Sequence, residues 1–163
     1  MTDTTAGRVV ILGVGNLLLG DEGVGVHVAR RLEQIELPAG VQVIEAGTMP
    51  TQALGPVGDL AKLVIVDAVA ADGPPGAVYR LPASVVAAAD AELSLHEFTL
   101  AEALAEWALQ GLEADRIVII GVQPHQVAWG TELSPEVQAS LPKIVDAAIA
   151  EAIAERTRSD DSQ

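Results

Sequence analysis

The stretch GVGNLLLGDEGVG, residues 13–25, decides how this chain folds. The aliphatic run VVIL directly before it, at residues 9–12, predicts a first strand. Apolar residues after it recur at the spacing of one helix face: Val24, Val28, Leu32 and Ile35. Asp21 or Gly20 is the expected cap of this helix. The stretch is therefore a strand-to-helix turn, and it places two carboxylates, Asp21 and Glu22, where the helix begins.

Four further aliphatic runs predict strands, and helical patterns lie between most of them. The strands are expected at residues 41–44, 63–66, 77–81 and 117–120. A weak helix is expected from Thr51, and a second from Ser94, where Glu97 completes a capping box. The final helix opens at Ser134, and it carries the following residues on one face: Val137, Leu141, Ile144, Ala148 and Ala152.

Alternating strands and helices are typical of a mainly parallel sheet between two helix layers. The strand at 77–81 follows Asp67 too closely for a helical crossover, so we expect it to pair antiparallel. No repeat, linker or change of composition marks a second domain. We therefore predict a single α/β domain over residues 1–163, a three-layer α/β/α sandwich with a mainly parallel, roughly five-stranded sheet. Its ends, residues 1–7 and 156–163, are expected to be flexible.

The composition agrees with this fold and excludes several functions. Half of the residues are hydrophobic but only 2% are aromatic, so the core is expected to be aliphatic. The absence of cysteine excludes disulfides, thiolate metal sites and a cysteine nucleophile. The net charge of −14 argues against nucleic acid and anionic membranes as partners. The polar N-terminus and the short apolar runs are unlike a signal peptide or a membrane span, so we expect a soluble cytoplasmic protein.

Three side chains that suit a metal or a catalytic role are expected at one edge of the sheet. Glu22 lies in the first turn of the first helix, Asp67 ends the strongest strand, and His96 lies in the turn that Ser94 caps. In such folds ligands bind beyond the carboxyl ends of the strands. Two carboxylates and an imidazole suit a divalent transition metal, with positions left for water or substrate.

Each of these residues also has a structural interpretation. Glu22 is favoured by the helix dipole in any case. Asp67 is suited to capping a following turn, and His96 to a position on the surface beside Glu97. Two other histidines, His27 and His125, are interpreted as surface residues, with His125 nearer the candidate site.

The glycine-rich turn does not fit a nucleotide site. A G-x-G-x-x-G motif needs glycine where Leu18 stands, and no Walker lysine follows Gly20. The acidic pair at the helix start would repel a pyrophosphate. A G-x-S-x-G nucleophile elbow is also missing from the chain.

The chain resembles the [NiFe]-hydrogenase maturation endopeptidases in the stretch GVGNLLLGDEGVG and in four shorter motifs. The shorter motifs are EAGT at residues 45–48, VIVDA at 64–68, SLHE at 94–97 and GVQP at 121–124, in the family's order. The resemblance spans residues 9–142, nearly the whole chain. It implies an endopeptidase that removes the C-terminal extension of a hydrogenase large-subunit precursor after nickel has been inserted.

The resemblance also implies roles for single residues. Glu22, Asp67 and His96 match the family's metal-contacting positions, and they would recognise nickel that the precursor itself supplies through its thiolates. Other divalent metals stay candidates for the site, and whether the enzyme holds a catalytic metal of its own stays open. The precursor is the expected partner, without nucleic acid or membrane, and we expect a monomer.

The second motif departs from the family pattern. EAGT replaces the Asp-Gly-Gly-Thr turn that members commonly carry, so the acid has one more methylene and the turn one less glycine. From this motif Glu45, Gly47 and Thr48 are candidate substrate contacts.

Two other functions stay open from the sequence. Because no nucleophile motif is present, the chain fits a nickel-sensing chaperone that docks on a metalloenzyme precursor without cutting it. A peptidyl-tRNA hydrolase also begins with a strand followed by G-x-G-N. The acidity of the chain and the Asp21-Glu22 pair argue against this last function.

Overall fold

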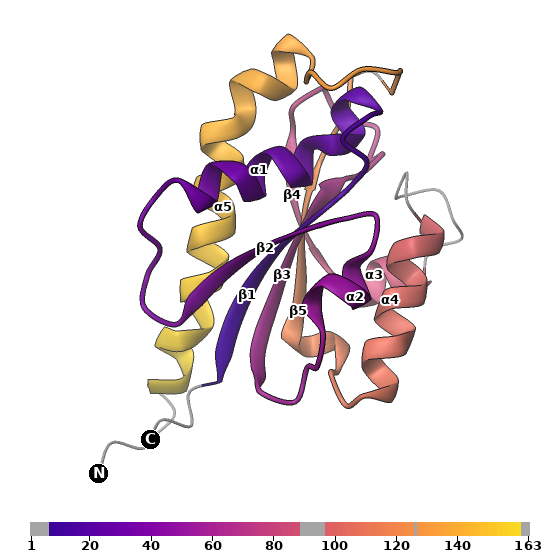
Figure 1. Ribbon diagram of the computed structural model, residues 1–163. Coiled ribbons are helices and arrows are strands. Elements are labelled where there is room, and N and C mark those ends of the chain that lie inside the picture. Colours follow the sequence, from indigo (N-terminus) through magenta and orange to yellow (C-terminus); the bar gives the residue numbers. More distant parts are fainter. Residues whose placement is uncertain (1–6, 89–96, 126, 161–163) are drawn as a thin grey trace.

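The computed structural model describes residues 7–88, 97–125 and 127–160 (Figure 1). The elements in chain order are β1 (Arg8–Val14), the 3₁₀ turn η1 (Gly20–Gly23), α1 (Val24–Glu33), β2 (Val41–Gly47), α2 (Pro50–Leu54), β3 (Leu60–Ala68), β4 (Val78–Pro82), α3 (Ala83–Ala88), α4 (Glu97–Leu109), η2 (Ala114–Arg116), β5 (Ile117–Val122) and α5 (Pro135–Asp160).

The five strands form one sheet in the order β2-β1-β3-β5-β4. The β1–β2, β1–β3 and β3–β5 pairs are parallel, and β4 pairs antiparallel with β5. The mainly parallel sheet and its one antiparallel edge strand are therefore confirmed. The antiparallel edge strand follows from chain length, because β4 comes soon after β3 and leaves no room for a helical crossover.

Two apolar clusters on opposite faces of the sheet make it a three-layer α/β/α sandwich (Figure 1). Alternate residues of β1 point to the two faces: Val9 and Ile11 belong to one cluster, Val10 and Leu12 to the other. α1 and α5 cover the first face, and α2, α3 and α4 cover the second. The predicted apolar face of α5 is buried in full: Val137, Leu141, Ile144, Ala148 and Ala152.

Glycines in the opening stretch let α1 lie directly on the sheet. A Cβ atom on Gly13 would overlap with the backbone oxygen of Gly25, and a Cβ on Gly25 would overlap with the backbone oxygens of Val14 and Val66. The first turn of α1 therefore sits on the junction of β1 and β3. Any larger side chain at Gly13 or Gly25 would push the helix off the strands.

This junction is the topological switch point of the sheet. The chain leaves β1 through α1 toward β2 on one side, and it leaves β3 toward β4 and β5 on the other side. In folds of this type the loops that follow the two adjacent strands separate at the switch point, and ligands bind between them. The carboxyl ends of β1 and β3 are thus the expected place for a ligand.

Two details of the first helix differ from the expectation. Its cap residue is Gly23, while Asp21 lies inside η1, so neither Asp21 nor Gly20 is the cap. The helix ends at Glu33 in a tightened turn, in which the Ile35 amide donates to the Leu32 carbonyl at 3.3 Å. That turn takes Ile35 off the apolar face, and its side chain is exposed.

Among the residues that the structure describes, none of the helices combines the length and the apolar character that a membrane span requires.

Candidate functional site

Glu22 lies where the glycine turn meets the sheet. It is the third residue of η1, which packs against β3, and it is only 4% exposed. A Cβ atom on Gly15 would overlap with the backbone oxygen of Glu22, so glycine at that position lets the turn fold back on itself. The Gly15 amide donates to the Gly47 carbonyl at 2.9 Å, which ties the turn to the end of β2. The local sequence thus holds Glu22 at the switch point.

Asp67 is the last residue but one of β3, and it is completely buried. Its Oδ1 atom accepts a hydrogen bond from the Ala68 amide at 2.8 Å. Val66, the residue before it, is in register with Gly13 and lies under the first turn of α1. Asp67, at the carboxyl end of β3, and Glu22, in the turn η1 that packs against β3, therefore lie at the same edge of the sheet.

The third predicted member, His96, lies outside the described residues, and so does the cap residue Ser94. α4 begins at Glu97. Among the described residues, no group of three or more histidines, aspartates or glutamates is arranged to hold a metal ion. The described part of the site thus supplies two carboxylates. Their oxygen donors suit a divalent cation whose remaining ligands come from other groups.

Asp21 has a structural task that the sequence reasoning missed. It is 1% exposed and accepts three hydrogen bonds from the segment between β5 and α5. The His125 amide donates to its Oδ2 at 2.9 Å, the Ser134 amide to its Oδ1 at 2.7 Å, and the Ser134 hydroxyl to its Oδ2 at 2.7 Å. Asp21 thus fastens η1 to the start of α5, and the backbone on which Glu22 sits is held by this link.

The two described histidines differ in their surroundings. His125 is exposed as expected, and its backbone contact with Asp21 places it beside the site. His27 is half-buried instead, and its Nε2 atom is buried with no hydrogen-bond partner among the described residues. Burial lowers the pKa of His27, and a hydrogen bond with the Thr131 backbone opposes this. The interpretation of His27 as a surface residue is therefore corrected, because the loop before α5 covers its ring.

The end of β2 carries the three candidate substrate contacts. Glu45 is ion-paired with Arg30 of α1, with 2.9 Å between Oε1 and Nη2, and this hydrogen-bonded pair raises the pKa of Arg30. Gly47 has a positive φ of 58° and accepts the Gly15 amide, while Thr48 is exposed. The longer glutamate side chain thus serves a contact between α1 and β2, and Thr48 is open to a ligand.

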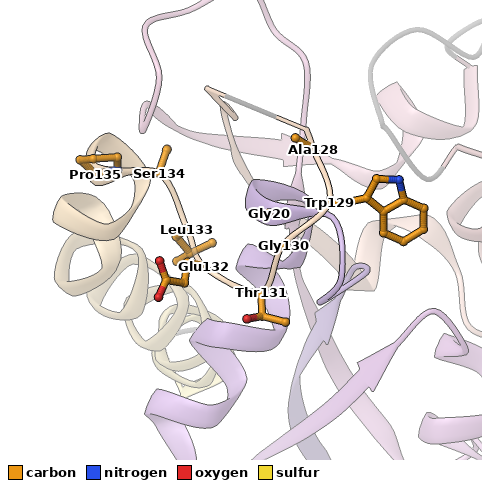
Figure 2. Close-up of a pocket in the computed structure, with 9 residues that line it drawn as sticks. All are labelled: Gly20, Ala128, Trp129, Gly130, Thr131, Glu132, Leu133, Ser134 and Pro135. Carbon is orange, nitrogen blue, oxygen red and sulfur yellow. The ribbon is translucent and has the colours of Figure 1, made fainter.

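A loop after β5 lies beside the same edge. The Gly130 amide donates to the Leu18 carbonyl at 2.9 Å, and the Gly130 carbonyl accepts from the Gly20 amide at 2.8 Å. Next to this bridge is an open pocket of about 510 Å³, lined by Gly20 and residues 128–135 (Figure 2). Of this loop, only His125 was predicted near the site from the sequence; residues 128–135 were not predicted there, and the one signal for them was Trp129, a rare aromatic residue in this chain.

Comparison with known proteins gives a consistent match over most of the chain. The sequence model of the family HycI, hydrogenase maturation protease, matches residues 26–151. Hydrogenase 2 maturation protease of Escherichia coli K12 is 31% identical over 146 residues, which cover 88% of this chain and 89% of that protein. Hydrogenase expression/formation protein HupD of Rhodobacter capsulatus is 33% identical over 152 residues, covering 91% and 70% of the two chains.

Solved structures match in the same way. The hydrogenase maturating endopeptidase HybD from Escherichia coli superimposes with a TM-score of 0.77 at 29% identity, over 91% of this chain and 93% of that one. The [NiFe] hydrogenase maturation protease HybD from Thermococcus kodakarensis gives a TM-score of 0.73 at 29% identity, over 89% and 99% of the two chains.

Proposed function

This chain belongs to the hydrogenase maturation proteases, endopeptidases that process the C-terminus of a hydrogenase large subunit, and we propose that its Glu22, Asp67 and His96 recognise nickel carried by the precursor. Its relatives are named as proteases, which favours the endopeptidase over the chaperone and the peptidyl-tRNA hydrolase. The protein is accordingly a hydrolase.

The observation that carries the proposal is the burial of two carboxylates at one edge of the sheet: Glu22 in η1, which follows β1, and Asp67 at the end of β3. Two carboxylates offset the charge of a divalent ion, and electrostatic attraction is stronger at a site from which water is largely excluded. His96 would add a nitrogen donor, which nickel accepts well.

The nucleophile and the general base for cleavage must be water or side chains that this chain contains. Because it contains no cysteine, a thiolate nucleophile is excluded, and water is the attacking group in the proposal. A carboxylate of Glu22 or Asp67 can accept the proton of that water as a general base and pass it to the departing amine as the scissile C–N bond breaks. Nickel, as part of the substrate, polarises the scissile carbonyl. Cleavage then depends on nickel insertion, because the precursor presents the missing component.

The proposal also covers the surroundings of the reaction. The precursor is the one macromolecular partner, and the protein acts as a monomer in the cytoplasm. The absence of cysteine and the acidic composition are compatible with that compartment. Thr48, with Gly47 and Glu45 behind it, contacts the precursor beside the cleavage site. Other divalent metals can replace nickel in binding assays, because carboxylate and imidazole ligands are not selective for one metal.

The test is to incubate the protein with nickel-loaded and nickel-free precursor and to follow the mass of the large subunit. The wild-type protein should shorten only the nickel-loaded form. Asp67→Asn and Glu22→Gln should slow the processing by about 10²-fold or more, while Glu36→Gln, at an exposed position, should leave it unchanged. Circular dichroism must show that each variant is folded. Processing by both site variants at the normal rate would refute the proposal.

A further inference from the structure

Exposed apolar side chains gather at the edge that holds Glu22 and Asp67. Four of them lie in loops that follow the carboxyl ends of β1, β2 and β5, and we call these four the apolar rim. They are Leu18, 55% exposed, Met49, 52%, Val127, 46%, and Trp129, 84%. Since the three strands are parallel, their carboxyl ends lie at one edge of the sheet. The apolar rim therefore lies at the same edge of the sheet as the two buried carboxylates.

The backbone presents two rim residues in a fixed arrangement. Leu19 and Gly130 form an isolated parallel bridge, with the two hydrogen bonds at Gly130 described above. Leu18 and Trp129 each precede one of the bridged residues, so the bridge holds both in place. In Figure 2 the indole of Trp129 projects away from Thr131 and the other pocket-lining side chains. A pre-ordered apolar surface loses little conformational entropy when a partner binds.

Trp129 is exposed, although aromatic residues are rare in this chain. Only 2% of the residues are aromatic, and the other tryptophan, Trp107, is completely buried. Single exposed apolar residues are common on protein surfaces. A tryptophan at 84% exposure, with three more apolar residues around one functional edge, is typical of an interface anchor, because buried tryptophan contributes heavily to binding.

We propose that the apolar rim binds an apolar segment of the hydrogenase precursor next to the scissile bond, and that this contact does not depend on nickel. The inference rests on the proposed function for the position of cleavage. A polypeptide whose scissile bond reaches Glu22 and Asp67 must cross the loops that carry the rim. The rim residues bear no charge, so apolar burial, rather than the net charge of −14, drives the contact.

Binding of the precursor then has two separable parts. The carboxylates distinguish nickel-loaded from nickel-free precursor, whereas the rim contributes the same affinity to both forms. Trp129 therefore determines how tightly the precursor binds, and Asp67 determines which form of it is processed. This division gives each part its own experimental signature.

The first experiment compares Trp129→Ala and Trp129→Phe in binding to full-length precursor with and without nickel. Trp129→Ala should raise Kd about 10- to 30-fold for both forms, and it should raise KM for processing with kcat unchanged. Trp129→Phe should restore most of the affinity. Leu109→Ala is the matched control, because Leu109 is 90% exposed at the C-terminal end of α4 and outside the rim. Equal Kd values for Trp129→Ala and wild type would overturn the inference.

The second experiment observes the contact directly. Enzyme labelled with 5-hydroxytryptophan can be excited selectively in the presence of the precursor's own tryptophans. Acrylamide should quench the exposed residue 129 in the free enzyme and spare the buried residue 107. Saturating precursor should protect residue 129, with and without nickel. Unchanged quenching would contradict the proposal.

The outcomes also separate this inference from the proposed function. A Trp129→Ala effect on the nickel-loaded form alone would overturn the inference, since the residue would then belong to nickel recognition. Normal processing by Asp67→Asn, together with the expected loss of affinity in Trp129→Ala, would refute the proposed nickel site and leave the rim in place.

Discussion

Asp21 and Ser134 lie 113 positions apart and share two hydrogen bonds of 2.7 Å, one from the Ser134 amide and one from its hydroxyl. The acceptor is a buried carboxylate, which also accepts the His125 amide. Hydrogen bonds to a charged acceptor are stronger than those between neutral groups. This link joins η1 to the residue directly before α5, and Glu22 follows Asp21 in the chain.

We predict that Asp21→Ala lowers the free energy of unfolding by about 2–4 kcal/mol, because three donors lose their charged acceptor in a buried place. Urea unfolding at pH 7 measures the change, with the exposed Glu36→Ala as the control at about wild-type stability. A double-mutant cycle with Ser134→Ala should give a coupling of about 1 kcal/mol or more. Additive effects of the two substitutions would show that the hydrogen bond from the Ser134 hydroxyl contributes nothing.

This relationship marks a boundary of what the sequence predicts. The strands were predictable because each is a local run of aliphatic residues, and the antiparallel edge strand because its connection is short. The position of Glu22 and Asp67 at the same edge of the sheet was predictable because parallel strand ends meet at one edge. The partner of Asp21 was not, since nothing near position 21 indicates Ser134. A carboxylate at a helix start is most simply interpreted as a cap, and that prediction was wrong.

The glycine positions in the opening stretch lead to a second prediction. Gly25→Ala should lower the free energy of unfolding by about 3 kcal/mol or more, because the new Cβ overlaps with the carbonyl oxygens of Val14 and Val66. Gly58→Ala is the matched control, since nothing lies within 4 Å of a Cβ at that position. The control should leave stability unchanged or raise it by about 0.4–1 kcal/mol. Similar stability of the two variants in thermal unfolding would contradict the close packing of α1 on the sheet.

A buried charge cluster also escaped prediction from the sequence. Lys62 of β3 is 1% exposed, and its Nζ donates to Oε1 of Glu151 at 2.7 Å and to the Glu151 carbonyl at 2.8 Å. Arg80 of β4 donates to Oε2 of the same carboxylate at 2.7 Å. Lys62 stands within an apolar run, where the local pattern predicts only a strand. Its partner on α5 is 89 positions away, so only the tertiary structure shows why a lysine is tolerated there.

The third prediction concerns the pH dependence of this cluster. Hydrogen bonds from Arg80, and secondarily from Lys62, lower the pKa of Glu151 from 4.5 to about 2. Because the pKa is lower in the folded state, the contribution to stability is complete above pH 4.5 and is lost as the pH falls toward 2. Glu151→Gln should cost about 3 kcal/mol at pH 7, since it leaves Lys62 charged and buried.

The stability difference between wild type and Glu151→Gln should therefore shrink between pH 5 and pH 2. Denaturant unfolding at a series of pH values gives this difference directly. Asp146→Asn, at an exposed position of the same helix, controls for the general effect of acid. A difference that stays constant over this range would show that the Glu151 carboxylate is not responsible.

The last prediction concerns His96, the one proposed metal contact outside the described residues. We expect His96→Ala to abolish processing of nickel-loaded precursor and to leave the fold intact, because the sequence places the residue at the edge and not in the core. His125→Ala is the control. His125 reaches Asp21 through its backbone amide, which alanine retains, so that variant should process normally. Mass analysis of the large subunit and thermal unfolding of each variant measure the two properties. Normal processing by His96→Ala would remove the histidine from the metal set and leave recognition to the two carboxylates, which then need a further ligand from the precursor itself.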